Sequence, residues 1–178
     1  MVILKGGSFI LRPFKKGDEV SLQKNIHNKK IYQYTLNIPY PYSMKDAHAW
    51  IKETIKQKRK KNPEQISWAI VMHDEVVGGI GFAKLYQQNQ HHKAELGYWL
   101  SQIHWGKGIT SKALKMVVAY GFKKLKFKRI YASVAKPNKA SVKVLRKNGF
   151  KLEGICKKSI LKDGIYHDEL IFAKLKRN

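Results

Sequence analysis

The sequence has a single cysteine, Cys156, and no long apolar run. One cysteine excludes an internal disulfide and a zinc site built from cysteines, so we expect a reducing compartment and no bound metal. The longest stretch without a charged residue, 31–44, contains two prolines and many polar groups, which excludes a membrane-spanning helix. The N-terminal segment is too short for a signal peptide, so we expect a cytoplasmic protein that does not bind a membrane.

Acidic residues are also scarce, with 12 Asp and Glu against 36 Lys and Arg, for a net charge of +24. The second half of the chain, from residue 90, carries 21 basic and five acidic side chains. Such a field attracts polyanions and repels polycations, which favours nucleotide cofactors, RNA or ribosomes as partners and disfavours polyamines. The charge alone leaves open whether it reflects RNA or ribosome docking or a lysine-rich composition.

The length of 178 residues and the 43% hydrophobic content predict one folded domain over residues 1–178. Hydrophobic periodicity and turn residues predict alternating strands and helices, with an ordered aromatic loop near the N-terminus. The predicted order is strand 8–14 with Pro13 at a sheet edge, helix 17–28, loop 31–42, a helix from residue 43, strands 66–72, 76–85 and 94–101, helix 110–125, strand 129–134, helix 138–147, and a hairpin of 150–161 and 165–175. This order predicts a mixed α/β (α+β) sandwich with helices packed on a sheet.

The segment Trp105-Gly106-Lys107-Gly108-Ile109-Thr110 lies between a predicted strand and a long amphipathic helix. Two glycines in a tight turn allow backbone N–H groups to converge, and the helix N-terminus adds a partial positive charge. Together these features indicate a binding site for a diphosphate. The segment lacks the spacing of the P-loop and of the Rossmann fingerprint, so neither of those nucleotide sites is predicted.

Several neighbouring motifs carry a family resemblance: Glu95-Leu-Gly-Tyr-Trp-Leu100 before the turn, and Asn138-Lys-Ala-Ser141 and Asn148-Gly-Phe150 after it. With the turn, they resemble the GNAT family of acetyl-CoA-dependent N-acetyltransferases. The segments 37–42, 46–51, 149–154 and 164–168 resemble its RimJ/RimL branch, which acetylates the N-termini of ribosomal proteins. The resemblance covers nearly the whole chain. It implies a mainly antiparallel mixed sheet whose central strands splay apart, flanked by helices, with acetyl-CoA in the opening.

The resemblance also implies which residues bind acetyl-CoA: Trp99, Leu100, Ser101, Trp105, Gly106, Lys107, Gly108, Ile109, Thr110 and Asn138. An alternative for Asn138 is a helix N-cap, and one residue can do both. The chain departs from the family pattern at position 145, where Leu145 replaces the tyrosine that many members use as general acid for the CoA thiolate. The resemblance to the RimL type implies Ser141 for that role instead, although a serine in the first turn of a helix can also be purely structural.

Glu95 is the best general-base candidate, because it is the only acid between Glu75 and Glu153 and lies in the strand that leads to the thioester. The alternative is a structural carboxylate paired with a nearby lysine. The loops 31–42 and 86–93 are expected to form the walls of the acceptor groove. They supply four candidate substrate-binding residues, namely Asn37, Tyr40, Tyr42 and His91.

A free α-amine has a pKa of about 7.7–8.0 and a lysine side chain one near 10.4, so deprotonation at neutral pH costs roughly 1 and about 4–5 kcal/mol, respectively. A site without an obvious strong base therefore suits the N-terminal α-amine of a protein, in this branch a ribosomal protein. Two alternatives stay open: an acetyltransferase for small amines, and a non-catalytic basic protein that binds RNA or ribosomes on the same fold. The sequence leaves open whether the chain is a monomer or a homodimer.

Overall fold

The computed structural model describes residues 2–86 and 91–176, and its strands form one sheet. The order across the described sheet is β1-β2-β3-β4-β5-β6-β8-β7. The strands are β1 Leu4–Lys5, β2 Ile10–Pro13, β3 Ile66–Met72, β4 Glu75–Ala83, β5 Lys93–Leu100, β6 Arg129–Ala135, β7 Lys151–Lys162 and β8 Ile165–Leu175. Neighbouring strands pair antiparallel except β5 and β6, which pair parallel, so the expected mixed and mainly antiparallel sheet is confirmed.

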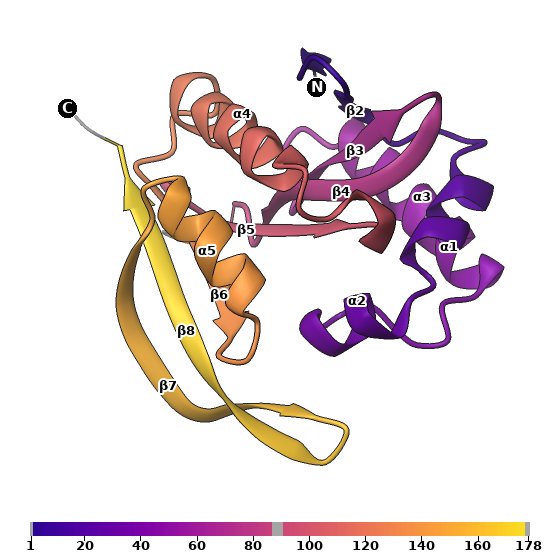
Figure 1. The fold of residues 1–178 in the computed structure, drawn as a ribbon. Coiled ribbons are helices and arrows are strands. Elements are labelled where there is room, and N and C mark those ends of the chain that lie inside the picture. The colour runs from indigo at the N-terminus through magenta and orange to yellow at the C-terminus, as the bar shows by residue number, and fades with distance from the viewer. Residues whose placement is uncertain (1, 87–90, 177–178) are drawn as a thin grey trace.

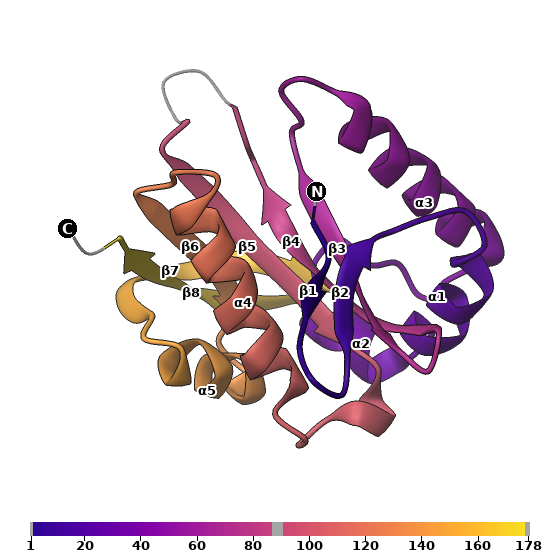
Figure 2. The same ribbon diagram turned by 90° about the horizontal axis from the view of Figure 1, so that it is seen from above.

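The helices cover both faces of the sheet, with α4 and α5 on one side and α1 and α3 on the other (Figures 1 and 2). Their bounds are α1 Glu19–Ile26, α2 Lys29–Tyr34, α3 Met44–Arg59, α4 Ile109–Lys123 and α5 Lys139–Lys147, with a short 3-10 helix, η1, at Gln102–His104. Each face has its own apolar core, which fits amphipathic helices that bury one stripe each. None of the described helices is both long and apolar enough to cross a membrane.

The feature that positions the site is the limited pairing of β5 with β6. Only residues 93–95 of β5 pair with residues 129–131 of β6, although β5 continues to Leu100 and β6 to Ala135. Along the rest of its length β5 pairs with β4 alone within the described residues. The sheet is therefore open at its centre, as the resemblance implied.

Two sequence predictions of secondary structure need correction. Residues 31–42 are not all loop, because α2 occupies the first part, and the Asn28 side chain accepts hydrogen bonds from the amides of Lys30 and Ile31 at its start. Strand β2 is not the sheet edge, because the short β1 pairs beside it. Pro13 lies beyond the two β1 pairs, so its missing N–H costs no bond to β1.

The β7–β8 hairpin extends past the sheet, and its turn reaches back to α2 (Figure 1). The Tyr32 hydroxyl donates to the Asp163 carboxylate at 2.5 Å, and this bond raises the pKa of Tyr32. The Lys162 ammonium donates to the Thr35 carbonyl and lies 3.7 Å from the centre of the Tyr32 ring. The hairpin and α2 therefore form one continuous rim beside the opening of the sheet.

The packing of α4 on β4 gives a stability prediction. A Cβ on Gly121 would lie 2.8 Å from Phe82 Cζ and 3.0 Å from Ile130 Cδ1, so Gly121→Val should lower the free energy of unfolding by about 2–3 kcal/mol through overpacking. The matched control is Gly154→Val in β7, where a Cβ meets nothing within 4 Å and the change should be near zero. Urea denaturation measures both, and equal stability of the two variants would contradict the packing described here.

Candidate active site

The turn between η1 and α4 presents a row of unbonded backbone amides. Gly106 and Gly108 both have φ of 75°, in the left-handed region that favours glycine, and a Cβ at either position would meet nothing within 4 Å. Gly108 is the N-cap of α4 and provides no side-chain cap. Within the described residues, the amides of residues 106–111 have no hydrogen-bond acceptor. An anion can therefore approach the helix N-terminus without a steric barrier.

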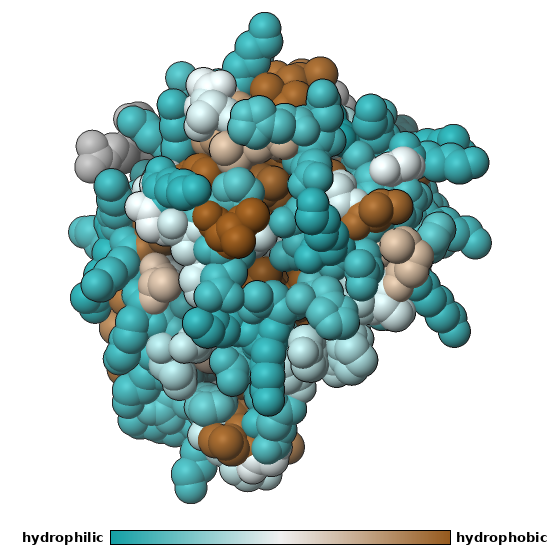
Figure 3. Space-filling view, turned by 45° about the vertical axis from the view of Figure 1, so that its right-hand side comes forward, coloured by the Kyte–Doolittle hydropathy of each residue, from teal (hydrophilic) through white to brown (hydrophobic). Residues whose placement is uncertain are grey.

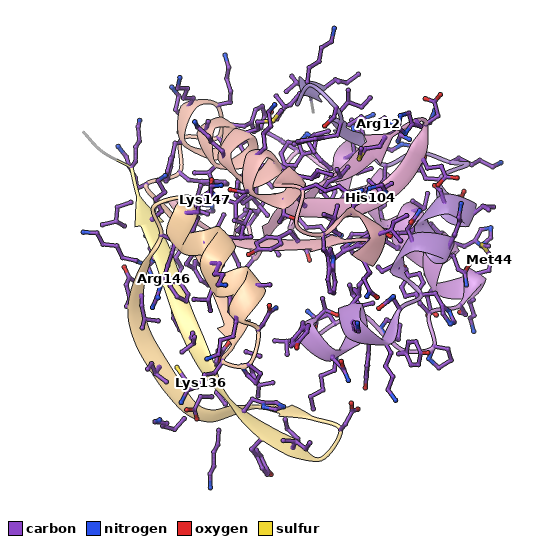
Figure 4. All side chains as sticks on the ribbon, viewed as in Figure 1. Arg12, Met44, His104, Lys136, Arg146 and Lys147 are labelled. Atoms are coloured by element: carbon purple, nitrogen blue, oxygen red, sulfur yellow. The ribbon has the colours of Figure 1, made fainter. Side chains whose placement is uncertain are left out.

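The position of this turn is fixed from both sides. The Trp105 indole N–H donates to the Leu100 carbonyl at 2.7 Å, which ties the turn to the end of β5. Ile109 is buried in the core, so only its backbone can face a ligand, whereas Lys107 is exposed. Burial lowers the pKa of His104, in η1, so this imidazole is neutral at pH 7 and adds no charge beside the turn (Figure 4). The amides of the turn and Lys107 both contribute positive charge there.

The open edge of β5 is the second part of the site. Ser101 donates its amide to the Val77 carbonyl on the β4 side. Because backbone groups alternate along a strand, Trp99 also points to β4, while the backbone groups of Tyr98 and Leu100 point to the open side. The Ser101 amide and the backbone groups of Trp99 therefore face β4, whereas both backbone groups of Tyr98 and the Leu100 amide face the opening; the Leu100 carbonyl already accepts the Trp105 indole N–H. Binding of acetyl-CoA by Trp99 and Ser101 stays a prediction.

Across the opening, α5 presents Ser141 to β5. The Tyr98 and Ser141 hydroxyl oxygens lie 2.6 Å apart, and burial raises the pKa of Tyr98 to about 12. Asn138 is the N-cap of α5, because its side-chain oxygen accepts the Ser141 amide at 3.0 Å. Leu145 is fully buried in the core. The sequence analysis did not single out Tyr98 as a site residue; the available signal was its phenol, which needs a polar partner when buried.

A cavity of about 510 Å³ lies on the opposite face of the sheet, between β4, β5 and the helices α1 and α3. Tyr98 and Trp99 of β5 line it, so it meets the open edge of the strand. Its other lining residues include Phe14, Leu22, Ile26, Asn37, Ile38, Pro39, Tyr42, Asp46, Trp50, Glu53, Gly79, Gly81 and Gly97. The cavity is mainly apolar, and a Cβ at Gly97 would meet nothing within 4 Å.

Of the four candidate substrate-binding residues, the structure places two in this cavity, Asn37 and Tyr42. Tyr40 is not among the described residues that line it, because its ring packs against His27 and Tyr32. His91 is also outside that lining; it is exposed and lies beside the Tyr86 ring. Residues 87–90 of the expected second wall lie outside the described residues.

Glu95 forms an ion pair with a nearby lysine, as expected if its carboxylate is structural. Its carboxylate lies 2.6 Å from Lys84 Nζ, and this interaction raises the pKa of the lysine. A second carboxylate that the sequence analysis did not single out, Glu169 of β8, accepts hydrogen bonds from the Ser133 and Ser159 hydroxyls, which lower its pKa. Catalysis by Glu95 stays a prediction. No group of three or more His, Cys, Asp or Glu side chains in the described chain is placed to hold a metal ion.

Comparisons with known proteins agree with this geometry. A family model described as an acetyltransferase (GNAT) domain matches residues 8–151. The uncharacterized N-acetyltransferase YoaA of Bacillus subtilis (strain 168) is 31% identical over 176 residues, covering 98% of this chain and 97% of that protein. The ribosomal-protein-serine acetyltransferase of Escherichia coli (strain K12) is 28% identical over 83% of this chain and 81% of its own. The spermidine N(1)-acetyltransferase of the same strain is 23% identical over 90% and 82%.

Solved structures share the fold along nearly the whole chain. The ribosomal L7/L12 α-N-protein acetyltransferase RimL, in complex with coenzyme A, superposes with a TM-score of 0.87 at 24% identity, covering 98% of both chains. RimJ of Mycobacterium smegmatis, in complex with CoA-disulfide, gives a TM-score of 0.84 at 22% identity, covering 98% of this chain and 86% of its own. The family match and the relative YoaA show that this chain belongs to the GNAT family of N-acetyltransferases.

Proposed function

We propose that this enzyme transfers the acetyl group of acetyl-CoA to the N-terminal α-amine of a protein, and that the protein is ribosomal. The observation that carries the proposal is the position of the open β5 edge. It lies between the amides of residues 106–111 on one side and the acceptor cavity on the other. A long thioester donor and an amine acceptor can therefore meet at Tyr98 and Trp99 from opposite directions.

In this proposal the turn binds the diphosphate of acetyl-CoA. The amides of residues 106–111 supply the hydrogen bonds, and Lys107 adds charge. The backbone groups of Tyr98 and the Leu100 amide, which point to the open side, bind the pantetheine arm in the manner of a neighbouring strand. Asn138 caps α5 with its side-chain oxygen, which leaves its amide nitrogen for the same arm.

The acceptor side suits an amine that is easily deprotonated. The two carboxylates that line the cavity are both bonded: Asp46 to Ser43 in the capping box of α3, and Glu53 to Gln57. Glu95, with Lys84 beside it, is the proposed proton acceptor, acting through water. An α-amine loses its proton at a cost of roughly 1 kcal/mol at pH 7, so a bonded carboxylate suffices. The ribosomal-protein-serine acetyltransferase among the relatives supports the same substrate class.

A second candidate acceptor is a small polyamine. Asp46 and Glu53 bring two carboxylates to the cavity, and hydrogen bonds from Ser43 lower the pKa of Asp46, so it is charged at neutral pH. The spermidine acetyltransferase among the relatives acts on such a cation. The net charge of +24 opposes the approach of polyamines, which is why the protein N-terminus is the first choice.

The proposed diphosphate turn gives a binding prediction. Gly108→Ala places a methyl group in the space left for the anion, and we expect at least about a tenfold rise in the Kd for CoA, measured by calorimetry. The matched control is Gly17→Ala, because Gly17 also has a positive φ with nothing near its Cβ but lies far along the chain from the turn. The control should lose about 1 kcal/mol of stability and keep its CoA affinity. Equal affinity in both variants would reject the site.

The acceptor class is tested with peptides that carry one lysine each and have either a free or a blocked N-terminus, together with spermidine. We expect acetyl transfer to the free N-terminus only, measured by mass spectrometry of the products. Equal rates on free and blocked peptides would reject the α-amine, and turnover on spermidine alone would favour the polyamine. Thermal stabilisation by acetyl-CoA without turnover on any amine would instead favour the non-catalytic binding protein.

We further propose that the protein docks on ribosomal RNA through a basic stripe on α5, made of Lys139, Lys143, Arg146 and Lys147. The spacing of these residues places them on one face of the helix, and all four are exposed. None of them makes an ion pair within the described residues. Figure 4 labels Arg146 and Lys147 on this helix, and Figure 3, turned by 45° from that view, shows mostly hydrophilic side chains with scattered hydrophobic patches.

The stripe predicts salt-dependent binding to ribosomes. A variant with Lys139, Lys143 and Arg146 changed to Gln should bind more weakly in co-sedimentation. Its plot of log K against log salt concentration should be shallower, by about 0.7–0.9 for each phosphate that the protein no longer neutralises. The control changes Lys58, Arg59 and Lys61 at the end of α3 to Gln, which removes the same charge from a different surface. Equally weakened binding in both variants would show a general field effect instead of a docking surface.

A further inference from the structure

The contact between Tyr98 and Ser141 joins the two sides of the open sheet. Tyr98 belongs to β5, beyond the last residue that pairs with β6, and Ser141 lies in the first turn of α5, which follows β6. Their hydroxyl oxygens are 2.6 Å apart. Leu145, where many GNAT enzymes carry a tyrosine, is fully buried. The phenol that reaches α5 in this protein therefore comes from the opposite strand.

We propose that Tyr98 is a positioning residue that donates a hydrogen bond to Ser141 and thereby directs the Ser141 proton to the sulfur of the leaving CoA thiolate. This inference rests on the proposed function of the site, and it adds a residue to the machinery of that reaction.

The geometry favours this direction of donation. Each hydroxyl has one proton, so only one of the two can be the donor between them. If Ser141 donated to Tyr98, the phenol proton would find only the Ser141 carbonyl, at 3.5 Å. If Tyr98 donates to Ser141, its proton has an acceptor at 2.6 Å and the serine proton is free for a ligand. The second arrangement satisfies both protons better.

The chemistry needs a hydrogen-bond donor at the sulfur. The amine nitrogen forms the C–N bond, the C–S bond breaks, and its electron pair stays on sulfur, while the amine gives up its proton to Glu95 through water. Burial raises the pKa of Tyr98 to about 12, so the phenol keeps its proton throughout and acts by hydrogen bonding only. The thiolate is stabilised by Ser141 and takes its proton from solvent on release.

Without Tyr98, Ser141 loses its orientation. A serine in the first turn of a helix readily turns its hydroxyl toward a nearby backbone carbonyl, which would take its proton away from the sulfur. The Asn138 side chain holds the Ser141 amide but does not contact the hydroxyl. The phenol is therefore the group in the described structure that fixes this hydroxyl.

The test uses Tyr98→Phe, Ser141→Ala and the double variant. Both single variants should lower kcat by about tenfold or more with less than about a threefold change in the KM for acetyl-CoA, because Ser141→Ala removes the hydrogen bond to the charged thiolate and Tyr98→Phe removes the group that orients it. The double variant should be no slower than Ser141→Ala, because the two residues act as one unit.

The second readout is the pKa of the thiol of bound CoA, which is measured through the ultraviolet absorbance of the thiolate. The desulfo-CoA complex serves as baseline and accounts for Cys156. Both variants should raise this pKa by about one unit, which corresponds to the tenfold change.

The control is Tyr120→Phe, which removes a hydroxyl from a tyrosine that packs on Trp68 in the core and should change neither readout. A shift with Ser141→Ala but none with Tyr98→Phe would overturn the role of Tyr98. Unchanged thiol pKa values in both variants, with desulfo-CoA still bound, would overturn the proposal and leave the proposed function standing. Failure of the wild-type protein to bind desulfo-CoA would overturn both.

Discussion

The arrangement of the site depends on the incomplete hydrogen bonding between β5 and β6. The two strands pair over three residues each and then diverge, which leaves backbone donors and acceptors at Tyr98 and Leu100 without a strand partner. Unpaired groups at the centre of a sheet carry a desolvation cost unless water or a ligand satisfies them. The opening is kept because other contacts hold its two sides: β4 along β5, β8 along β6, and the Tyr98–Ser141 contact across the opening.

The proposed anion site and the proposed acceptor cavity both lie next to this opening. The turn at residues 106–111 begins a few residues beyond the end of β5 and is tied back to it by Trp105. The cavity lies on the other face, and Tyr98 and Trp99 reach it from the same strand. The strand β5 therefore leads to the proposed anion site and carries the open backbone edge and part of the wall of the proposed acceptor cavity. Displacing β5 would disturb all three at once.

The sequence predicted best what depends on neighbours in the chain. The glycines of the 106–110 turn, the start of the helix at residue 43 and most strands are set by local spacing. It failed where partners are distant: Tyr98 meets Ser141 across 43 residues, and Glu169 meets Ser133 across 36. The helix α2 was not predicted, because its aromatic residues and the nearby prolines indicate a loop. Asn28, a residue type that often caps helix N-termini, was the sequence signal for it.

Several of the few acidic residues of this chain form ion pairs within the fold. Asp18 is buried and binds Arg12 through two hydrogen bonds, Asp168 binds Lys136 and Lys157, and Glu95 binds Lys84. With 12 acids against 36 basic residues, pairs of this kind leave most cations without a counterion. The excess is therefore a property of the surface, whereas the proposed site relies on amides and hydroxyls. In the proposals made above, diphosphate binding by the amides and thiolate stabilisation by Ser141 depend on fixed geometry, whereas docking through α5 depends on surface charge that salt screens, so salt should weaken docking more than catalysis.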